Sequence, residues 1–377
     1  EAVVLCVPDQ LPLEMTAAAL RAGKHVLCEK PMALSLEECE EMRRVEKETG
    51  KKLFGTTVSV SASRFEDYRK CPFMYFCKKG LSLYPPEKIE LNRPSKGTVI
   101  HYCLSEIMNA NRGNFTKLDR KALDAEVRKY LGLYYNSAAV GGNYGKSERY
   151  KAAYNGLADT LTDILVRLVD EFNQCEFVAS DFEYKIGRGG SENALTLTTP
   201  NGITIQFEGS VDRIDVYKKD EKLYVRVIDY KSGTKTFDFD DLVYGINMQM
   251  LLYLFAITDT NSNGKYKNAI PAGVLYMPAK DSYGELGREV QTVTEELRKK
   301  AYNSVYKMSG TVLYDTGCDE AAKAMENELK GEYIPVKVSG GAVDRYSTPV
   351  TQNQLANLRK YAYNLMMETV DDMTCGK

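Results

Sequence analysis

Long hydrophobic runs are missing from this sequence of 377 residues. The longest, around Met248 to Ile257, is about half of the roughly 20 residues that a membrane-spanning helix needs, which favours a buried helix. No positively charged N-terminal stretch precedes a hydrophobic segment and a cleavage site, so nothing indicates secretion. We therefore expect a cytoplasmic protein that does not contact membranes. The nine cysteines are irregularly spaced, which is typical of reduced thiols or a metal ligand and not of a disulfide framework.

Histidine is scarce, with His25 and His101 as the two examples. Because they lie in different parts of the chain, Ser-His-Asp or Cys-His catalysis in the larger part would depend on His101 alone, and we discount it. A complete phosphate loop is also lacking. The run from Gly141 to Ser147 resembles one, but the pattern G-x-x-x-x-G-K-S requires glycine where Val140 stands, so we expect no ATP binding.

Charge divides the chain, although the net charge is only −2 and the 44% hydrophobic content is that of a globular protein. Residues 1–50 hold six basic and ten acidic side chains, whereas residues 64–96 hold eight basic and four acidic ones. The contrast indicates two parts with different roles. The first part has the pattern of an α/β unit. It predicts strands at Ala2 to Cys6 and His25 to Cys28, and helices at Leu13 to Ala22 and Ser35 to Thr49, with Ser35 and Glu38 forming a capping box.

The run Ala22-Gly23-Lys24-His25-Val26-Leu27-Cys28-Glu29-Lys30-Pro31 resembles the Gfo/Idh/MocA oxidoreductases, in which the equivalent of Lys30 lies near the nicotinamide. However, the G-x-G-x-x-G turn that binds a dinucleotide is absent, and Pro12 stands where that family has a histidine. We therefore predict a partial Rossmann-like fragment over residues 1–52 that binds no NAD. An oxidoreductase fragment remains the alternative function. The chain starts within a strand, so we expect a fragment or a fusion, with its junction near Gly50 to Leu53.

From residue 53 onward, long helical patterns surround a block of alternating strands. The predicted helices are Ser61 to Lys79, Gly97 to Ala110, Ser147 to Gln174, Gly245 to Ile257, Val293 to Ala301, Glu320 to Leu329 and Gln352 to Glu368. The predicted strands are Glu176 to Ile186, Leu195 to Thr199, Ile203 to Glu208, Val211 to Tyr217, Leu223 to Tyr230 and Gly273 to Met277.

Two neighbouring strands end in acidic and basic residues. Side chains alternate along a strand, so Asp229 and Lys231 share a face with the apolar Val225 and Val227. Burying these charges is costly unless they are paired or bind an ion. A bend at Gly209 would aim Asp212 toward Asp229. Two carboxylates suit Mg²⁺ or Mn²⁺, and a nearby ammonium can activate water, which together indicate phosphodiester hydrolysis. The alternative is an ordinary ion pair at a strand end.

Four blocks in this order and spacing resemble the RecB-like nucleases of the PD-(D/E)XK type, and among them the C-terminal domains of AddB proteins. The blocks are Gly97 to His101, Gly209 to Asp215, Asp229 to Gly233 and Gln249 to Tyr253. The resemblance covers residues 53–377. It implies a restriction-endonuclease-like mixed sheet with many flanking helices, and a Mg²⁺-dependent deoxyribonuclease that processes double-strand breaks for recombinational repair. DNA ends and an AddA-type helicase-nuclease subunit would be its partners.

The resemblance also assigns roles to residues. His101, Asp212, Asp229 and the main-chain carbonyl of Tyr230 would bind the metal, and Lys231 would be the catalytic lysine. Gln249 and Tyr253, one helical turn apart, would line the site or contact DNA.

The segment around Cys71 resembles the part of AddB that supplies the first ligand of a 4Fe-4S cluster. The remaining ligands of that family form a C-x2-C-x5-C group near the C-terminus, which this sequence lacks, and Cys375 cannot replace three thiolates. We therefore expect that a truncated chain does not assemble the cluster.

Three readings stay open at this stage. Glu183 is either a further acidic site residue or an exposed strand residue, and Asp215 makes either a supporting hydrogen bond or a surface pair. The basic, aromatic segment 64–79 either follows a DNA strand or packs its rings into a core beneath solvated lysines. A non-catalytic DNA-binding scaffold is a further alternative, which the intact Asp212, Asp229 and Lys231 disfavour.

Overall fold

The computed structural model describes residues 2–5, 7–8, 11–28, 33–50, 53–54, 57–83, 96–137, 148–187, 195–233, 236–279, 292, 294–315 and 317–375. Among these residues, none of the helices combines the length and the apolar character that crossing a bilayer would require. The predicted phosphate-loop region at 140–147, the stretch Glu29 to Pro31 and the junction residues Lys51 and Lys52 lie outside the described residues.

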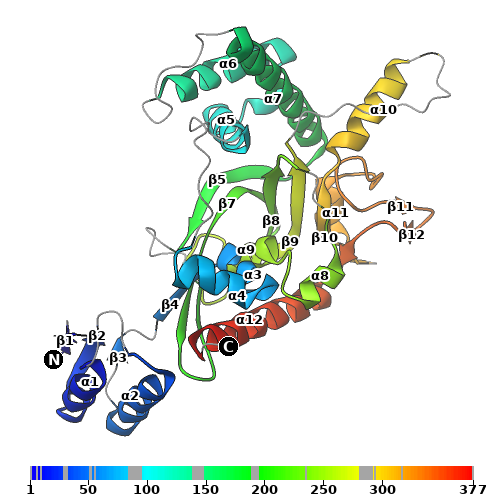
Figure 1. Cartoon of the computed structure of the whole chain (residues 1–377). Helices are drawn as coiled ribbons and strands as arrows, with labels where there is room; N and C mark the ends of the chain where they lie inside the picture. The colour runs from blue at the N-terminus through cyan, green and yellow to red at the C-terminus, as the bar shows by residue number, and fades with distance from the viewer. Residues whose placement is uncertain are drawn as a thin grey trace.

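The N-terminal part forms a small parallel sheet with its own hydrophobic cluster. Its elements are β1 (Ala2–Leu5), α1 (Pro12–Arg21), β2 (His25–Cys28), α2 (Leu36–Thr49) and β3 (Leu53–Phe54), with the strands in the order β1-β2-β3. Leu20, Val26 and Met42 are fully buried in this cluster, which is distinct from the core of the remaining chain. Figure 1 shows these elements in blue beside the rest of the molecule. The predicted strand-helix-strand-helix order is confirmed, whereas the domain boundary at residue 52 stays a prediction.

The predicted cap of α2 is confirmed, with one difference. The Ser35 hydroxyl accepts a hydrogen bond from the Glu38 amide at 3.2 Å, as an N-cap does. The Glu38 carboxylate reaches one residue further back than in a standard capping box and accepts from the Leu34 amide at 2.9 Å.

The larger part is built on an eight-stranded mixed sheet. Its strands are β4 (Thr57–Ser61), β5 (Val178–Ile186), β6 (Leu195–Thr198), β7 (Thr204–Lys219), β8 (Lys222–Lys231), β9 (Ile270–Pro278), β10 (Ser309–Leu313) and β13 (Pro349–Val350). The order is β13-β10-β9-β8-β7-β4, with β5 and β6 also paired to β7. The pair β7 and β8 is antiparallel, whereas β8 and β9 are parallel. The predicted mixed α/β fold is therefore confirmed.

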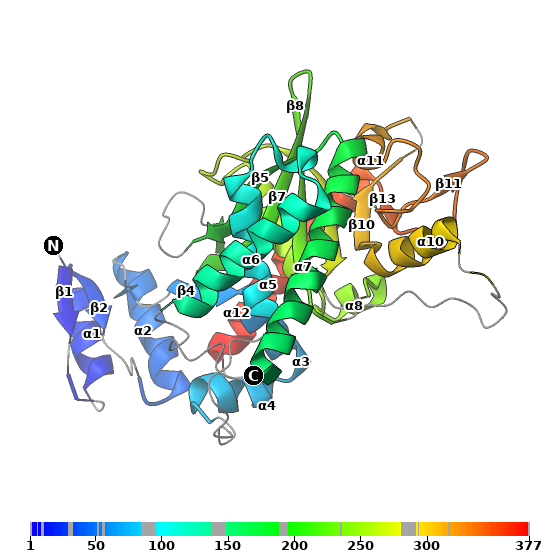
Figure 2. The same cartoon turned by 90° about the horizontal axis from the view of Figure 1, so that it is seen from above.

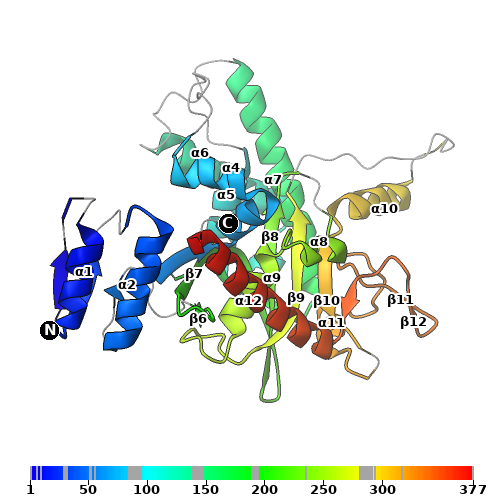
Figure 3. The same ribbon diagram turned by 60° about the horizontal axis from the view of Figure 1, so that its bottom comes forward.

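Helices cover this sheet in two groups. The helices are α3 (Ala62–Lys70), α4 (Pro72–Tyr75), α5 (Lys96–Ala110), α6 (Arg120–Asn136), α7 (Glu148–Gln174), α8 (Phe239–Val243), α9 (Gln249–Thr258), α10 (Glu295–Tyr306), α11 (Glu320–Met325) and α12 (Gln352–Cys375). In Figure 1, α5, α6 and α7 gather at the top, and α3, α9 and α12 lie in the lower half. Figure 3 shows α12 running obliquely past α9. Every residue of α9 after Gln249 is buried, so the buried helix predicted there is confirmed.

Two predictions around glycine and proline are wrong. The strands expected at 203–208 and 211–217 form the single strand β7, which runs through Gly209 without ending. Figure 2 shows the long β7–β8 hairpin projecting beyond the neighbouring strands. The helix expected from Ser61 to Lys79 ends at Lys70 and is followed by α4 and a π-helical turn, Phe76–Gly80. Pro72 disfavours helical backbone at Cys71, which is extended with φ −164°.

Helices α6 and α8 and strands β3, β4, β10 and β13 were not predicted, and several of the predicted elements have shifted ends. Leu123, Val127 and Leu131 of α6 recur every four residues and are buried, so its pattern could have been recognised.

Candidate metal and nuclease site

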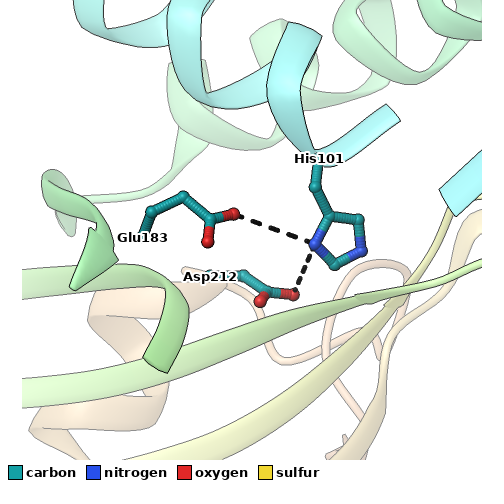
Figure 4. Close-up of side chains that lie close together, drawn as sticks. All are labelled: His101, Glu183 and Asp212. Carbon is teal, nitrogen blue, oxygen red and sulfur yellow. Dashed lines mark ion pairs between the residues drawn. The ribbon is translucent and has the colours of Figure 1, made fainter. Parts of the chain in front are cut away.

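Three potential metal ligands from three elements come together where β5 and β7 pass beneath α5. Figure 4 shows His101, from α5, pointing toward Glu183 of β5 and Asp212 of β7. The His101 Nδ1 atom lies 3.3 Å from Asp212 Oδ2 and 3.9 Å from Glu183 Oε1. One donor atom from each residue lies within 4.8 Å of the other two. The residues are separated by up to 111 positions in the sequence (from 101 to 212), so the sheet and α5 create this group.

The main chain of Tyr230, on β8, joins the same group. Its amide donates a hydrogen bond to Asp212 Oδ2 at 2.9 Å. Its carbonyl oxygen lies 2.9 Å from His101 Nε2. When Nε2 carries the hydrogen and donates to that carbonyl, the lone pair of Nδ1 faces the two carboxylates. This tautomer would leave Nδ1 free to bind a cation.

Asp229 and Lys231 lie next to this group, two residues apart on β8. The Lys231 Nζ atom is 2.6 Å from Asp229 Oδ2. Asp229 is only 6% exposed, whereas the Lys231 side chain is one-third exposed. The buried carboxylate is thereby paired, and the ammonium still reaches solvent.

Negative charge is concentrated here. Burial and the neighbouring Asp212 carboxylate raise the pKa of Asp229, although Lys231 opposes the shift. Burial and Asp212 likewise raise the pKa of Glu183. Burial alone would lower the pKa of His101, but its hydrogen bond with Asp212 and the surrounding negative charge raise it. In all three shifts the Asp212 carboxylate acts in the direction that favours a bound proton or cation.

The donor set suits a hard divalent cation. It consists of carboxylate oxygens of Glu183 and Asp212 and an imidazole nitrogen of His101, with the Tyr230 carbonyl oxygen and the Asp229 carboxylate nearby. Oxygen-rich sets of this kind match the preferences of Mg²⁺ and Mn²⁺. The residues therefore fit the metal that the sequence predicts.

Glu183 has an unusual backbone. Its φ of 47° lies in the left-handed region, which costs a non-glycine residue on the order of 1–2 kcal/mol. The register of β5 places it opposite Asp212, because Phe182 pairs with Arg213 and Tyr184 with Val211. The position of Glu183 beside Asp212 favours a further acidic residue of the site over an exposed strand residue. Its side chain is nevertheless about half exposed.

Gln249 and Tyr253 lie one turn apart on α9, as expected. The Gln249 amide nitrogen Nε2 donates to the Tyr253 hydroxyl at 3.1 Å. Glu66 of α3 accepts from the main-chain amide of Gln249 at 3.1 Å, and this acidic neighbour was missed from the sequence. No local pattern could have revealed it, because the two residues are 183 positions apart.

Asp215 is not a surface residue, so that reading is wrong. It is fully buried and accepts hydrogen bonds from Arg213 and Arg226. Alternation along β7 turns Asp215 to the side opposite Asp212 and Ile214, where the two arginines lie. The other prediction, that Asp215 makes a supporting hydrogen bond, agrees with these contacts.

Cys71 acts as a helix cap. Its sulfur accepts a hydrogen bond from the Met74 amide at 3.4 Å, at the start of α4. Within the described part of the chain, Cys71 belongs to no group of three potential metal ligands. The iron-sulfur role stays a prediction for relatives that carry the other cysteines.

The basic, aromatic segment 64–79 contains both buried and exposed aromatic rings. Phe65 and Tyr68 are buried, and the Arg69 side chain donates to the Tyr244 carbonyl, so these residues support the fold. Phe73 and Phe76 are instead 75% and 53% exposed. A DNA contact in this segment stays a prediction.

Comparisons with known proteins agree with this geometry. Residues 59–371 match the family model of the PD-(D/E)XK nuclease superfamily, and residues 1–57 match that of an oxidoreductase family with an NAD-binding Rossmann fold. Both resemblances drawn from the sequence are thus confirmed.

Similar proteins are named as one subunit of an ATP-dependent helicase/deoxyribonuclease. The one from Ruminiclostridium cellulolyticum is 27% identical over 340 residues, covering 88% of this chain and 29% of that protein. The one from Anoxybacillus flavithermus is 28% identical over 345 residues, covering 89% of this chain and 29% of that protein. The chain thus spans less than a third of the length of these relatives.

Proposed function

The chain belongs to the PD-(D/E)XK nuclease superfamily, and we propose that it is a divalent-metal-dependent deoxyribonuclease that hydrolyses phosphodiester bonds at DNA ends. The observation that carries this proposal is the grouping of His101, Glu183 and Asp212 beside the pair of Asp229 and Lys231. The first three residues could bind a cation, and Lys231 supplies a positively charged side chain for a phosphate.

His101, Asp212, Asp229 and the Tyr230 carbonyl would hold Mg²⁺ or Mn²⁺, and Glu183 is positioned to join them. When bound, such a cation polarises a phosphate oxygen and offsets the charge that develops during displacement. Without a cation, the negative charge of these carboxylates would disfavour binding of the phosphate.

Lys231 would act on the substrate directly. Its ammonium donates hydrogen bonds either to the attacking water or to a phosphate oxygen, where it stabilises the growing negative charge. Asp229 holds the ammonium in place at 2.6 Å. Gln249 and Tyr253 offer an amide and a hydroxyl on one face of α9, suited to hydrogen bonds with the DNA backbone.

The names of the relatives support the choice of DNA and of a partner. Each is named as one subunit of an ATP-dependent helicase/deoxyribonuclease, and that name describes a complex with more than one subunit. We infer that this chain acts with an AddA-type helicase-nuclease subunit that delivers DNA ends, in the cytoplasm, during recombinational repair.

A metal titration of cleavage tests the proposal. Linear single- and double-stranded DNA would be incubated with the full chain, after removal of metal with EDTA, across a range of Mg²⁺ and Mn²⁺ concentrations. Cleavage should depend on metal and should be lost in Asp229→Ala. Glu221→Ala, an exposed acidic residue in the β7–β8 turn, is the matched control and should cleave normally. DNA binding without metal-dependent cleavage would contradict the proposal and favour a scaffold.

A further inference from the structure

Four charged side chains are buried together behind the strands that carry the site. Arg213, Asp215 and Arg226 are completely inaccessible to solvent, and Glu171 of α7 nearly so. Arg226 Nη2 lies 2.7 Å from Glu171 Oε1 and 2.9 Å from Asp215 Oδ2. Arg213 Nη2 donates to Asp215 Oδ2 at 3.1 Å. The four residues, which we name the buried charge chain, carry equal numbers of positive and negative charges.

A chain of this kind is not needed for stability alone. Removing charges from water costs several kcal/mol per ion in general, and well-packed apolar residues often stabilise a core as well or better. Burial works against the charged form of Arg213, but Asp215, Tyr230 and Glu171 together outweigh it, and the pKa of Arg213 lies above its ordinary value. The phenyl rings of Phe172 and Phe177 lie over Arg213 and Arg226, at 5.2 and 5.0 Å. The guanidinium groups are therefore charged and fixed in orientation.

One contact leads from the buried charge chain to the metal-binding group. Arg213 Nη1 donates to the Tyr230 hydroxyl at 3.1 Å, and that hydroxyl donates in turn to Met108 Sδ. The main chain of the same tyrosine binds Asp212 through its amide and faces His101 through its carbonyl. In a strand, the direction of a side chain is coupled to the orientation of its two peptide groups. Fixing the Tyr230 hydroxyl thus fixes the two groups that contact His101 and Asp212.

We propose that Arg213 and Asp215 are positioning residues for the metal site, which the buried charge chain holds in register by fixing the Tyr230 hydroxyl between Arg213 of β7 and Met108 of α5. The inference rests on the proposed function, because it assumes that His101 and Asp212 bind a divalent cation. It assigns a role to side chains that touch neither metal nor DNA. Outer partners of metal ligands commonly change metal affinity about 10- to 100-fold when they are removed.

Tyr230→Phe tests the link with the smallest change, since it removes the hydroxyl and keeps the ring and the main chain. Its matched control is Tyr224→Phe, six residues earlier on the same strand, where a buried tyrosine donates its hydroxyl hydrogen to Glu320 at 3.0 Å. Mn²⁺ binding to the full chain would be followed by the electron paramagnetic resonance signal of free Mn²⁺. The dissociation constant should rise about tenfold in Tyr230→Phe and stay within about twofold of wild type in Tyr224→Phe.

Thermal unfolding separates positioning from stability. Tyr230→Phe loses the contacts of its hydroxyl with Arg213 and Met108, and Tyr224→Phe loses its hydrogen bond to Glu320, so both melting temperatures should fall, but only Tyr230→Phe should lose Mn²⁺ affinity. Asp215→Asn, where it folds, should also weaken Mn²⁺ binding. Unchanged Mn²⁺ affinity in Tyr230→Phe would overturn the inference, as would equal losses in Tyr230→Phe and Tyr224→Phe. A wild-type chain that binds no Mn²⁺, or an Asp212→Asn chain that binds it normally, would instead contradict the proposed function.

Discussion

Lys231 combines a buried partner with an exposed ammonium. Its Nζ atom lies 2.6 Å from Asp229 Oδ2, and a third of its side chain is accessible. An ordinary ion pair at a strand end would have both partners in solvent and would contribute about 0–1 kcal/mol. Here the carboxylate is buried beside a second acid, so the ammonium offsets that charge while remaining accessible from solvent.

Lys231→Ala should reduce metal-dependent DNA cleavage by at least about a hundredfold, because it removes the cation that acts on water or phosphate. The chain should remain folded, since the side chain is not part of the core. Cleavage rate and circular dichroism would be measured together. Lys222→Ala, at the exposed start of the same strand, should retain cleavage. Full activity in Lys231→Ala would refute the role of this lysine.

The pKa shifts predict how pH and metal act together. The pKa values of His101, Glu183 and Asp229 lie above their ordinary values of 6.5, 4.5 and 3.8. The metal-free folded protein therefore holds these protons more tightly than the unfolded chain. The stability that they contribute is present below the ordinary pKa values and is lost as the pH rises through the raised ones.

Because a cation replaces those protons, Mn²⁺ should raise the melting temperature little at about pH 5 and more at about pH 8. Differential scanning fluorimetry with and without Mn²⁺ would measure the difference, which should vanish in Asp212→Asn. A stabilisation by Mn²⁺ that is equal at both pH values would contradict the assignment of these groups as ligands.

At the scale of elements, α9 lies so close to β7 that one position excludes a side chain. A Cβ atom added to Gly209 would lie 2.2 Å from Cε1 of Tyr253. The bend toward Asp229 expected at Gly209 stays a prediction, but the absence of a side chain at Gly209 has a visible consequence. It allows the Tyr253 ring to approach the main chain of β7.

Gly209→Ala should force Tyr253 or α9 to move and should destabilise the protein by about 1–3 kcal/mol, as overpacking does. Urea unfolding would measure the change. Gly156→Ala is the control, because Gly156 lies in α7 with no atom near its added Cβ and should be neutral or stabilising by about 0.5–1 kcal/mol. A Gly209→Ala chain as stable as wild type would show that this contact is not tight.

Elements with a clear periodic pattern could be predicted from the sequence, and those set by distant contacts could not. The alternation from Val225 to Lys231 predicted both β8 and the side on which Asp229 and Lys231 lie. The burial of Asp215 depends on arginines of β7 and β8 and on Glu171 of α7, 44 positions away in sequence (from 171 to 215). The contact between Glu66 and Gln249 depends on how α3 packs beside α9.

In the whole molecule, the described residues form two hydrophobic clusters, each packed on its own sheet. The net charges of residues 1–50 and 64–96 already indicated two parts with different roles. Residues 1–57 and 59–371 also match different families. These observations support, without testing it, the predicted division of the chain near residue 52.

Leu20→Ala should therefore destabilise the N-terminal part by about 2–5 kcal/mol and leave Mn²⁺ affinity unchanged. Leu104→Ala is the matched comparison, because this equally buried leucine lies on α5 three residues after His101. It should lower the unfolding transition of the larger part. Chemical unfolding and Mn²⁺ titration would be measured on both full-length variants. A loss of Mn²⁺ affinity in Leu20→Ala would contradict the independence of the two parts.

We infer that His101, Glu183, Asp212 and Asp229 surround one divalent cation. Electron spin echo envelope modulation of the Mn²⁺-loaded chain tests it directly, because an imidazole ligand adds a ¹⁴N modulation and the sequence has only one other histidine, His25. We expect a ¹⁴N signal in wild type that persists in His25→Gln and disappears in His101→Gln. Bound Mn²⁺ without that signal, or a signal that His101→Gln leaves intact, would contradict it.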